Sequence, residues 1–536
     1  MVAAVLLVGR AGAAEAVRAA SGEAVIDLAP PFGIEVAGRV RPIWVLRAGA
    51  RADAPTSLTL VKGAVTTSPS IAVTRGVAYR WHAEVTGPLQ IVATWEDAAN
   101  HPVGHPVAAS VNAGMAEASS TAPADASALR LRIHARAGGG TVRALSVRVE
   151  RGTAVERFPD FARAALAFSF DWESAMGGLI HARSNMTADG SPSVAKAEAM
   201  ARDMREGARF LVALFHRYGI RGSFYATGYN LLSGNPRCEK FAGDPTYAHA
   251  GAPWRSNYWQ HHPWYGHDPC TTEARAPAWY FASATRELVR HGEEIGCHTF
   301  GHMLLRGASA AELLADLGQW TRSARALGLP PARSFSFPWT ASQGVDAALF
   351  RVLRRFGFRT LVRLHQPLPH PYELDRAPAE PDLVIFPDVY VRSTHLGRSA
   401  ALETIDGVLA RRGVVSLWTH PHEIVESPDG ETIWREVVSR AAARRGEGLW
   451  IAPVSEIVDF ALATERVVVS STIRGGRTML WIENRSGRQL RGLTLTRPAV
   501  TGPVTVGGVR WTDVRGAQIR LPQLAPGRRI EVVTAP

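Results

Sequence analysis

Two short stretches far apart in the chain end abruptly in side chains that can bind a metal ion. The first is an apolar run that ends in two carboxylates, Asp171 and Glu173. The second ends in two histidines four positions apart, His298 and His302. Two histidines with one carboxylate can hold zinc and leave a position open for water. The other carboxylate could then take a proton from that water. These residue types indicate metal-assisted hydrolysis.

Length and composition predict several folded domains. A chain of 536 residues with 46% hydrophobic and 20% charged residues is expected to form two to four globular domains. The net charge is +12, but only three of the 60 basic residues are lysines. An arginine excess of this kind is typical of a GC-rich coding bias rather than of a nucleic-acid surface, so no nucleic-acid partner is expected.

The positive charge is concentrated at the C-terminal end. From Arg466 onward the chain carries 12 arginines and three acidic residues, a net charge of +9. This predicts a separate basic module that could contact an anionic cell-surface polymer. A solvated basic surface without a partner explains the charge equally well. The oligomeric state is left open.

The first residues contain a short apolar run, Met1–Val8, followed by small residues. We expect residues 1–22 to be the remnant of an export signal or a disordered terminus, because a basic leading segment is absent. No apolar run approaches the roughly 18–20 residues that a membrane-spanning helix needs. The expected location is the bacterial periplasm or the extracellular space, with the cytoplasm as the alternative.

Strands alternate with helices in the middle of the chain, which predicts a parallel sheet wound into a barrel. The flanking segments contain short alternating strands between turn residues, which predicts two β-sandwiches. The N-terminal one, at 23–155, resembles carbohydrate-binding modules, and its Trp81 and Trp95 could be stacking platforms or core. The barrel is expected at 156–462 and the basic C-terminal sandwich at 463–536. Expected barrel strands are 166–170, 223–227, 294–297, 334–337, 360–363, 383–386, 414–418 and 449–452; expected helices are 195–218, 280–291, 310–327, 345–356, 400–411 and 433–445.

The metal-capable residues all follow predicted strands, and so does His420. In barrels the chemistry sits at the C-terminal ends of the strands. A single histidine or aspartate in such a place is usually structural, but five of them at one end of a barrel favour a functional site.

The chain resembles the NodB-type polysaccharide deacetylases, carbohydrate esterase family four. Four motifs carry the resemblance: the strand that ends in Asp171, the strand Gly222–Gly228, the segment Gly292–His302, and the stretch Leu417–His420. The family has a deformed (β/α) barrel. Its activity implies removal of N-acetyl groups from an amino-sugar polysaccharide or glycan with a divalent metal ion, for which zinc is the expected ion.

The resemblance also implies roles for residues. Asp171 would be the base, Glu173, His298 and His302 the metal ligands, and His420 the acid that protonates the leaving nitrogen. The substrate would meet four side chains, Trp172, Trp339, Leu417 and Trp418, with a backbone N–H near Trp339 at the oxyanion.

Two motifs depart from the family pattern. Trp172 replaces the second adjacent aspartate, so it stays open whether Asp171 or Glu173 is the ligand. The third motif, Ser336–Thr340, lacks the arginine that orients the base, so another residue must replace it. Two alternative functions therefore remain: hydrolysis of another non-peptide C–N bond in a small molecule, and glycan binding without catalysis on a degenerate barrel.

A long segment, 232–279, is rich in tryptophan, tyrosine and histidine. Long loops are usually functional or disordered. Its aromatic residues, among them Trp254, Tyr258 and Trp264, suggest a lid that stacks on sugars. An aromatic mini-core closed by a Cys238–Cys270 bridge is the alternative.

Overall fold

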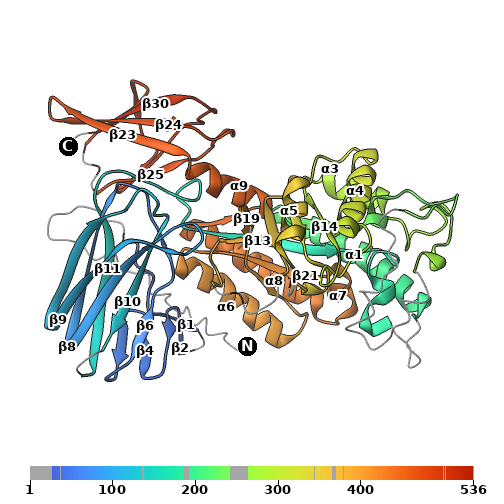
Figure 1. Ribbon diagram of the computed structural model, residues 1–536, viewed down its shortest axis with the longest axis horizontal. Coiled ribbons are helices and arrows are strands. Elements are labelled where there is room, and N and C mark those ends of the chain that lie inside the picture. Colours follow the sequence, from blue (N-terminus) through green and yellow to red (C-terminus); the bar gives the residue numbers. More distant parts are fainter. Residues whose placement is uncertain are drawn as a thin grey trace, which may run out of the picture.

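A computed structural model describes residues 27–36, 38–135, 138–185, 192–241, 264–342, 345–364, 368, 370–377, 380–498, 500 and 502–534. The expected terminal segment 1–22 lies outside these ranges. Figure 1 shows an N-terminal β region, a central unit of strands and helices, and a C-terminal β region that lies above the junction of the other two. Among the helices of the described ranges, none is long and apolar enough to cross a membrane.

A ten-stranded sheet forms the centre of the molecule, and its order is β18-β19-β17-β16-β15-β14-β13-β21-β20, with β22 paired to β13. All pairs are parallel except β18 with β19. All eight expected barrel strands are present. The strands are β13 (Ala164–Trp172), β14 (Ser223–Ala226), β15 (Glu294–Cys297), β16 (Ser334–Ser336), β17 (Thr360–Val362), β18 (Asp375–Ala377), β19 (Glu380–Ile385), β20 (Asp388–Tyr390), β21 (Val414–Thr419) and β22 (Leu449–Ile451).

One short connection brings the two ends of this sheet together. Strand β19 pairs with β17, whereas β20 pairs with β21. Only Phe386 and Pro387 separate β19 from β20. The same run of chain therefore begins on one edge of the sheet and ends on the other, and the sheet is a nearly closed barrel. The prediction of a barrel is confirmed as far as a nearly closed, barrel-like sheet.

The expected helices are present, with ends that differ by a few residues. They are α1 (Val194–Tyr218), α3 (Ala282–Arg290), α4 (Ala310–Ala326), α5 (Ala347–Arg355), α6 (His395–Arg411) and α8 (Gly430–Ala443). Two helices were not expected, α7 (Pro421–Glu426) and α9 (Val454–Thr464). Helix α7 begins with a proline directly after His420, where the ring fits the first helical turn.

Side chains along the barrel strands divide between the outside and the interior. On β13 the aromatic residues Phe168, Phe170 and Trp172 join the large core beneath the helices. The residues between them face inward, because successive strand residues point to opposite faces. In the lower part of the interior, a separate apolar cluster fills the barrel; it includes Ala165, Tyr225 and Val384. Polar residues replace this cluster toward the carboxyl ends of the strands.

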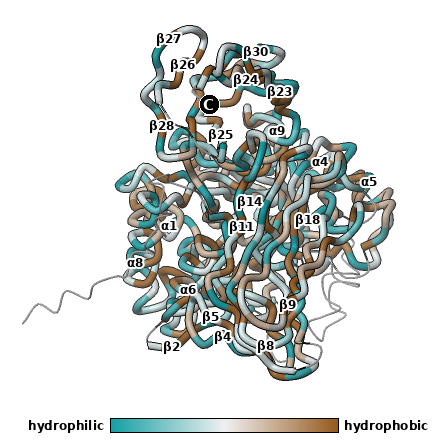
Figure 2. The backbone as a smooth tube through the Cα atoms, turned by 90° about the vertical axis from the view of Figure 1, so that its left-hand side faces the viewer, coloured by the Kyte–Doolittle hydropathy of each residue, from teal (hydrophilic) through white to brown (hydrophobic). Residues whose placement is uncertain are grey.

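The N-terminal region contains one nine-stranded sheet and a small two-stranded sheet, β1 (Gly33–Val36) with β2 (Arg39–Pro42). The strands of the larger sheet are β3 (Val45–Leu46), β4 (Ala50–Ala54), β5 (Ser57–Leu60), β6 (Val65–Thr67), β7 (Ile71–Ala72), β8 (Ala78–Glu96), β9 (Pro102–Thr121), β10 (Ala128–His134) and β11 (Gly140–Arg151). The short alternating strands expected in this region include the two halves of β8, between which the pairing with β9 shifts register at Thr86–Leu89. Apolar and polar positions alternate along β8 (Figure 2). The N-terminal β-sandwich stays a prediction, since these strands share one hydrogen-bonded sheet.

Strand β9 was not expected, because alanine, glycine and serine give it no strand pattern. Trp81 and Trp95 on β8 are fully buried in the core of this region. They are core residues, and the idea that they stack on sugars is wrong.

Two further sheets form the C-terminal region, a five-stranded one of order β23-β24-β30-β26-β27 and a four-stranded one of order β12-β25-β29-β28. Both contribute to one apolar cluster. Strand β12 belongs to the N-terminal part of the chain, yet it pairs with β25. The strands are β12 (Ala154–Val155), β23 (Val467–Arg474), β24 (Arg477–Asn484), β25 (Thr494–Thr496), β26 (Val504–Val506), β27 (Val509–Trp511), β28 (Val514–Arg515), β29 (Gln518–Arg520) and β30 (Arg529–Thr534).

The contact between α1 and α7 generates a prediction. A Cβ on Gly207 of α1 would lie 2.0 Å from the carbonyl oxygen of Pro421. We expect Gly207→Ala to separate the two helices and lower the free energy of unfolding by about 1–3 kcal/mol. The control is Gly318→Ala in α4, where a Cβ would meet only the end of Arg322 at 3.5 Å. That helix should gain up to about 1 kcal/mol. Equal urea stability of the two variants would contradict the packing argument.

Candidate metal and acid–base site

The carboxyl ends of several barrel strands bring polar side chains to one place. Asp171 is the penultimate residue of β13, and Glu173 directly follows the strand. His298 directly follows β15, and His420 directly follows β21. Arg363, which was not expected in the site, directly follows β17. Residues from four strands therefore converge at one end of the barrel.

Glu173 and the two histidines form the tightest group. Oε1 of Glu173 lies 3.1 Å from Nε2 of His302 and 3.4 Å from Nε2 of His298. All three side chains are buried. Burial raises the pKa of the Glu173 carboxyl, but the two histidines outweigh it and hold the pKa well below its usual value. This carboxylate is therefore ionised.

The hydrogen bonds of His298 test whether a cation fits this group. Nδ1 of His298 lies 3.0 Å from the carbonyl oxygen of Ser336, which can only accept a hydrogen bond. A neutral His298 therefore carries its proton on Nδ1 and turns the lone pair of Nε2 toward Glu173. A lone pair that faces a carboxylate oxygen is stabilised by a cation between them. The donor set of two imidazoles and one carboxylate is one that divalent metals such as zinc accept.

Two other groups of side chains could also hold a cation, but they fit less well. The oxygens of Asp171 already accept hydrogen bonds from Ser336 and Arg363. Nδ1 of His420 is directed at Glu423. The three possible groups within the described residues are Glu173–His298–His302, Asp171–Glu173–His420 and His420–His422–Glu423.

The segment that carries the two histidines is fixed through its backbone. The carboxylate of Asp316, buried on α4, accepts hydrogen bonds from the N–H groups of Phe300 at 2.6 Å and Gly301 at 2.9 Å. Thr299 and His302 both have positive φ values, 58° and 54°. Such conformations cost free energy in residues other than glycine. Asp316 therefore holds a strained segment in the shape that directs both histidines to Glu173.

Glycine is required beside Glu173. Gly178 has φ 146°, and a Cβ there would lie 2.4 Å from Oε2 of the Glu173 carboxylate. A side chain at position 178 would therefore displace this carboxylate.

Asp171 is held by a different set of partners. Nε of Arg363 lies 3.2 Å from Oδ1 of Asp171, and Oγ of Ser336 donates to the same oxygen at 3.2 Å. Arg363 is fully buried and pairs through Nη1 with Asp388 at 3.0 Å. Its guanidinium also donates to Oγ of Ser169 at 3.1 and 3.2 Å. The orientation of Asp171 is thus fixed by donors from two other strands, Ser336 on β16 and Arg363 after β17.

These partners also set the charge of Asp171. Burial raises the pKa of its carboxyl, but the guanidinium of Arg363 and then His298 and His420 outweigh burial and lower the pKa. Burial dominates for Asp388, whose pKa is raised even though Arg363 opposes the shift. Arg363 therefore keeps Asp171 ionised and ready to accept a proton.

His420 approaches the two carboxylates from the end of β21, the strand next to β13. Its Nε2 lies 3.8 Å from Oδ2 of Asp171 and 3.9 Å from Oε1 of Glu173. Its Nδ1 lies 2.8 Å from Oε1 of Glu423 on α7. Burial lowers the pKa of His420, but the hydrogen bond and charge of Glu423 outweigh burial and raise it to about 9. His420 is therefore a protonated imidazolium at neutral pH.

Glu423 has two further hydrogen-bond partners. Its second oxygen accepts from the hydroxyls of Thr419, at 3.0 Å, and Tyr390. Burial raises the pKa of Glu423, whereas His420 lowers it to about 2, so the carboxylate is ionised beside the imidazolium.

The four expected substrate residues lie in different places. Trp418 packs its ring 3.9 Å from the guanidinium carbon of Arg363, and the ring of Trp339 lies 4.8 Å from that of His302. Trp172 and Leu417 are fully buried in the core beneath the helices. The indole N–H of Trp172 donates to Thr285, on the far side of β13 from Asp171. Strand alternation thus puts Trp418 at the site and directs Trp172 and Leu417 into the core, whereas Trp339 reaches the site from the short 3-10 turn Pro338–Thr340.

The Cys238–Cys270 disulfide is present. It encloses a segment whose residues 242–263 lie outside the described ranges, so the expected lid residues Trp254 and Tyr258 do too. At its base, Asp268 accepts hydrogen bonds from Asn235 and from the hydroxyls of Tyr229 and Tyr280.

No protein-family model and no curated protein matches the chain. Among solved structures, similar ones include a candidate polysaccharide deacetylase from Mycobacterium smegmatis, at 20% identity over 57% of this chain and 93% of that one, with a TM-score of 0.39. Puue allantoinase matches at 13% identity over 57% and 92%, with a TM-score of 0.38. The family 4 carbohydrate esterase from Streptomyces lividans in complex with acetate matches at 13% over 54% and 92%, with a TM-score of 0.27. At these scores the likeness carries no argument about function.

Sequence reasoning missed four residues that hold the site: Arg363, Asp388, Glu423 and Asp316. Arg363 and Asp388 each occupy a position at the end or start of a barrel strand, as Asp171 does. A search for charged residues at every strand end would have found both. No comparable pattern marks Asp316, whose role depends on how α4 packs against a distant segment.

The metal site can be tested by substitution. We expect purified protein to bind about one divalent ion, and Glu173→Ala, His298→Ala and His302→Ala each to lose it, because two remaining protein donors hold a metal poorly. Asp171→Asn should retain the ion. The control is His291→Ala, an exposed histidine at the end of α3. Metal content measured by mass spectrometry that stays unchanged in both His298 and His302 variants would place the ion elsewhere.

Proposed function

We propose that this protein is a metal-dependent hydrolase that removes N-acetyl groups from an amino-sugar-containing polysaccharide or glycan. The observation that carries the proposal is that the two carboxylates have different surroundings. Glu173 faces two histidines, whereas Asp171 faces donors that orient it and keep it ionised. The first arrangement suits a metal ligand and the second suits a base. The motif resemblance to NodB-type deacetylases supplies the substrate class and the type of barrel.

The chemistry can be assigned to the residues present. A divalent metal ion held by Glu173, His298 and His302, with zinc as the proposed ion, would polarise the amide carbonyl and make water more acidic. Asp171 accepts the proton from water, and Arg363 holds the carboxylate in place. His420 carries a proton on Nε2, which faces the site, and gives it to the leaving nitrogen while Glu423 stabilises the imidazolium.

The aromatic side chains at the site support a sugar substrate. Trp339 and Trp418 both lie beside the polar group, and such rings can pack on the faces of sugars. Trp339 has a positive φ of 65°, and a backbone N–H near it is the proposed oxyanion donor.

Arg363 argues against a non-catalytic protein. The absence of the third-motif arginine favoured a degenerate barrel, but Arg363 makes the contact to Asp171 that such an arginine would make. A protein that only binds glycans has no use for an ionised, oriented Asp171 opposite a protonated His420. Hydrolysis of a small-molecule amide remains the competing function, and substrate tests separate the two.

Location and partners are part of the same proposal. We place the protein in the bacterial periplasm or outside the cell. The Cys238–Cys270 disulfide supports this location, since disulfides persist in oxidising compartments. The proposed partners are the glycan substrate and an anionic cell-surface polymer that contacts the basic C-terminal region.

The decisive experiment measures acetate release from a panel of N-acetylated glycans, with and without a chelator. Acetate release that stops with the chelator and returns with zinc supports the proposal. Ammonia or amine release from small amides, with no acetate from any glycan, would support the competing function. An inactive but glycan-binding protein would support the non-catalytic one.

Arg363 gives a sharper test of the base. We expect Arg363→Lys to lower kcat at least about tenfold while metal content stays unchanged, because a single compact ammonium nitrogen cannot occupy the separate positions from which Nε, Nη1 and Nη2 of Arg363 reach Asp171, Asp388 and Ser169. The control is Arg355→Lys at the exposed end of α5. A variant with wild-type kcat would show that the orientation of Asp171 does not limit the reaction.

The role of His420 predicts a change in pH dependence. Glu423 raises the pKa of His420 to about 9, so the proton required on His420 is lost only as the pH rises through that value. In Glu423→Gln the pKa should fall toward the ordinary value of about 6.5, and the alkaline limb of kcat should move to lower pH. The control is Glu426→Gln, which removes a carboxylate that pairs with His422 instead. An alkaline limb that does not move would remove His420 as the acid.

A further inference from the structure

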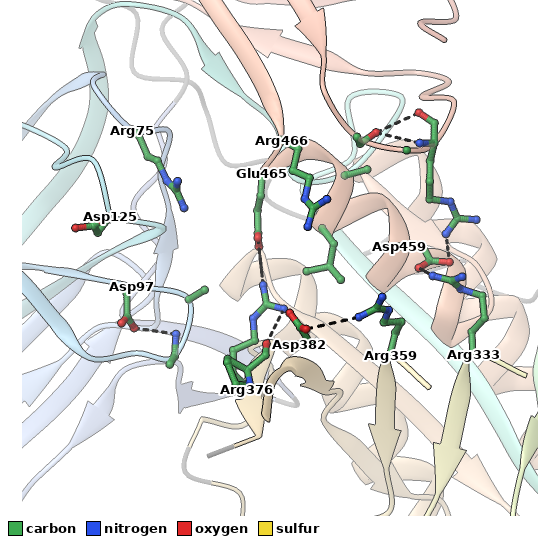
Figure 3. Close-up of a pocket in the computed structure, with 18 residues that line it drawn as sticks. Arg75, Asp97, Asp125, Arg333, Arg359, Arg376, Asp382, Asp459, Glu465 and Arg466 are labelled. Carbon is green, nitrogen blue, oxygen red and sulfur yellow. Dashed lines mark hydrogen bonds and ion pairs between the residues drawn. The ribbon is translucent and has the colours of Figure 1, made fainter. Parts of the chain in front are cut away.

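A second cavity lies at the opposite end of the barrel from the metal and acid–base site. Arg333 and Arg359 line it, and they directly precede β16 and β17. The residues of the metal and acid–base site follow the other ends of these or neighbouring strands. The cavity has a volume of about 600 Å³ and lies where all three regions meet (Figure 3). That volume is within the range of about 300–1,000 Å³ that small-ligand sites occupy.

The wall of this junction cavity is rich in guanidinium groups. Two of these groups come from β-rich parts of the chain on either side, Arg75 from the N-terminal region and Arg466 from the start of the C-terminal region. Figure 3 shows Arg75 on the side of the N-terminal strands and Arg466 on the other side of the junction. The arginines that line the cavity are Arg75, Arg333, Arg359, Arg376, Arg466 and Arg488.

The carboxylates of the cavity are mostly committed to other groups. Asp459 is buried and pairs with both Arg333, at 2.5 Å, and Arg488. Asp382 is shared between Arg354, at 2.6 Å, and Arg359, at 4.0 Å. These ion pairs fix part of the wall and leave few carboxylates for the remaining arginines.

The other acidic residues that line the cavity do not provide partners for the remaining arginines. Glu465 is taken by Arg376 at 3.1 Å. Asp97 accepts hydrogen bonds from the backbone N–H groups of Ala99 and His101 in its own turn. Asp125 lies on the same wall as Arg75, but no ion pair joins them in the described structure.

Arg75 and Arg466 are therefore cations without a partner carboxylate within the described part of the chain, and both are exposed to the cavity. The backbone of Arg466 is fixed nevertheless: its N–H donates to Ala463, and its carbonyl accepts from Arg485. A guanidinium presents a planar set of donors that matches carboxylate, sulfate or phosphate oxygens. The guanidinium groups of Arg75 and Arg466 come from different regions of the chain, so together they can bind a ligand with more than one oxyanion group.

We infer that the junction cavity binds the oxyanion groups of an anionic ligand, and that Arg75 and Arg466 are its main contacts. An acidic oligosaccharide segment and a small free oxyanion share this chemistry. Because the cavity and the metal site lie at opposite ends of the barrel, binding here attaches the protein to an anionic ligand without occupying the site of hydrolysis. The inference does not depend on which reaction that site performs.

The test uses the full-length protein and calorimetric titration with three probes: tri-galacturonate, inorganic sulfate and neutral chitotriose. We expect tri-galacturonate to bind and its affinity to fall as salt rises, because salt screens exposed charges. In the double variant Arg75→Gln/Arg466→Gln the Kd should rise by at least about tenfold, since each lost charge-assisted hydrogen bond is worth roughly that much. If sulfate binds wild type as tightly as tri-galacturonate does, and the double variant loses this binding, the ligand of the cavity is a small free oxyanion rather than an oligosaccharide.

The matched control is Arg477→Gln, an exposed arginine at the start of β24 that does not line the cavity. Because Arg75 and Arg466 make no described ion pair, the double variant should keep the thermal unfolding midpoint of wild type and its hydrolysis of a small soluble substrate. Equal loss of binding in Arg477→Gln, unchanged binding in the double variant, or chitotriose binding as tightly as tri-galacturonate would each overturn the inference. Loss of hydrolysis in Asp171→Asn with anion binding intact would separate this site from the proposed reaction.

Discussion

A fully buried guanidinium organises the polar end of the barrel. Arg363 lies between the carboxylates of Asp171 and Asp388, and a buried charge is tolerated only when such partners balance it. The three residues come from three strand ends, so the ion pairs also hold those strand ends at fixed separations. Arg363 is the largest of the influences that lower the pKa of the buried Asp171, with His298 and His420 after it, and together they outweigh burial. The position of Glu173, two residues further, follows from that of Asp171.

The closure of the barrel makes this arrangement possible. Strand β20 carries Asp388, and it reaches the far edge of the sheet because Phe386 and Pro387 carry the chain across the gap after β19. Toward the amino ends of the strands the interior is filled by an apolar cluster, and at the level of Asp388 the hydroxyls of Ser169 and Ser416 share a hydrogen bond. The interior thus changes from apolar to polar along the strands, and the ionised groups all lie at one end.

The other end of the same strands is also charged, but in a different way. Arg333 is exposed and Arg359 is half-buried there, and the nearby carboxylates of Asp459 and Asp382 are each shared between two arginines. At the carboxyl ends the charges are buried, paired and closely packed, which suits chemistry on a precisely held group. At the amino ends they are open and incompletely paired, which suits attachment of an anion. The chain therefore places two kinds of electrostatic site on one barrel, as far apart as the strands allow.

The sequence by itself determined the barrel, its eight expected strands and six expected helices, and the two stretches that hold Asp171, Glu173, His298 and His302. Local patterns suffice to predict these elements and stretches, because the periodicity of strands and helices and the positions of strand ends can be recognised from consecutive residues. The partners of those side chains were decided only by the tertiary structure. Arg363 and Asp316 act through contacts with residues that closure of the sheet or packing of a helix brings near, and no local pattern records such contacts. Glu423 is only three residues from His420, but the short helix α7 is what turns its carboxylate back to the ring. Trp172 and Leu417 show the converse: their neighbours in sequence lie at the site, but strand alternation turns both side chains into the core.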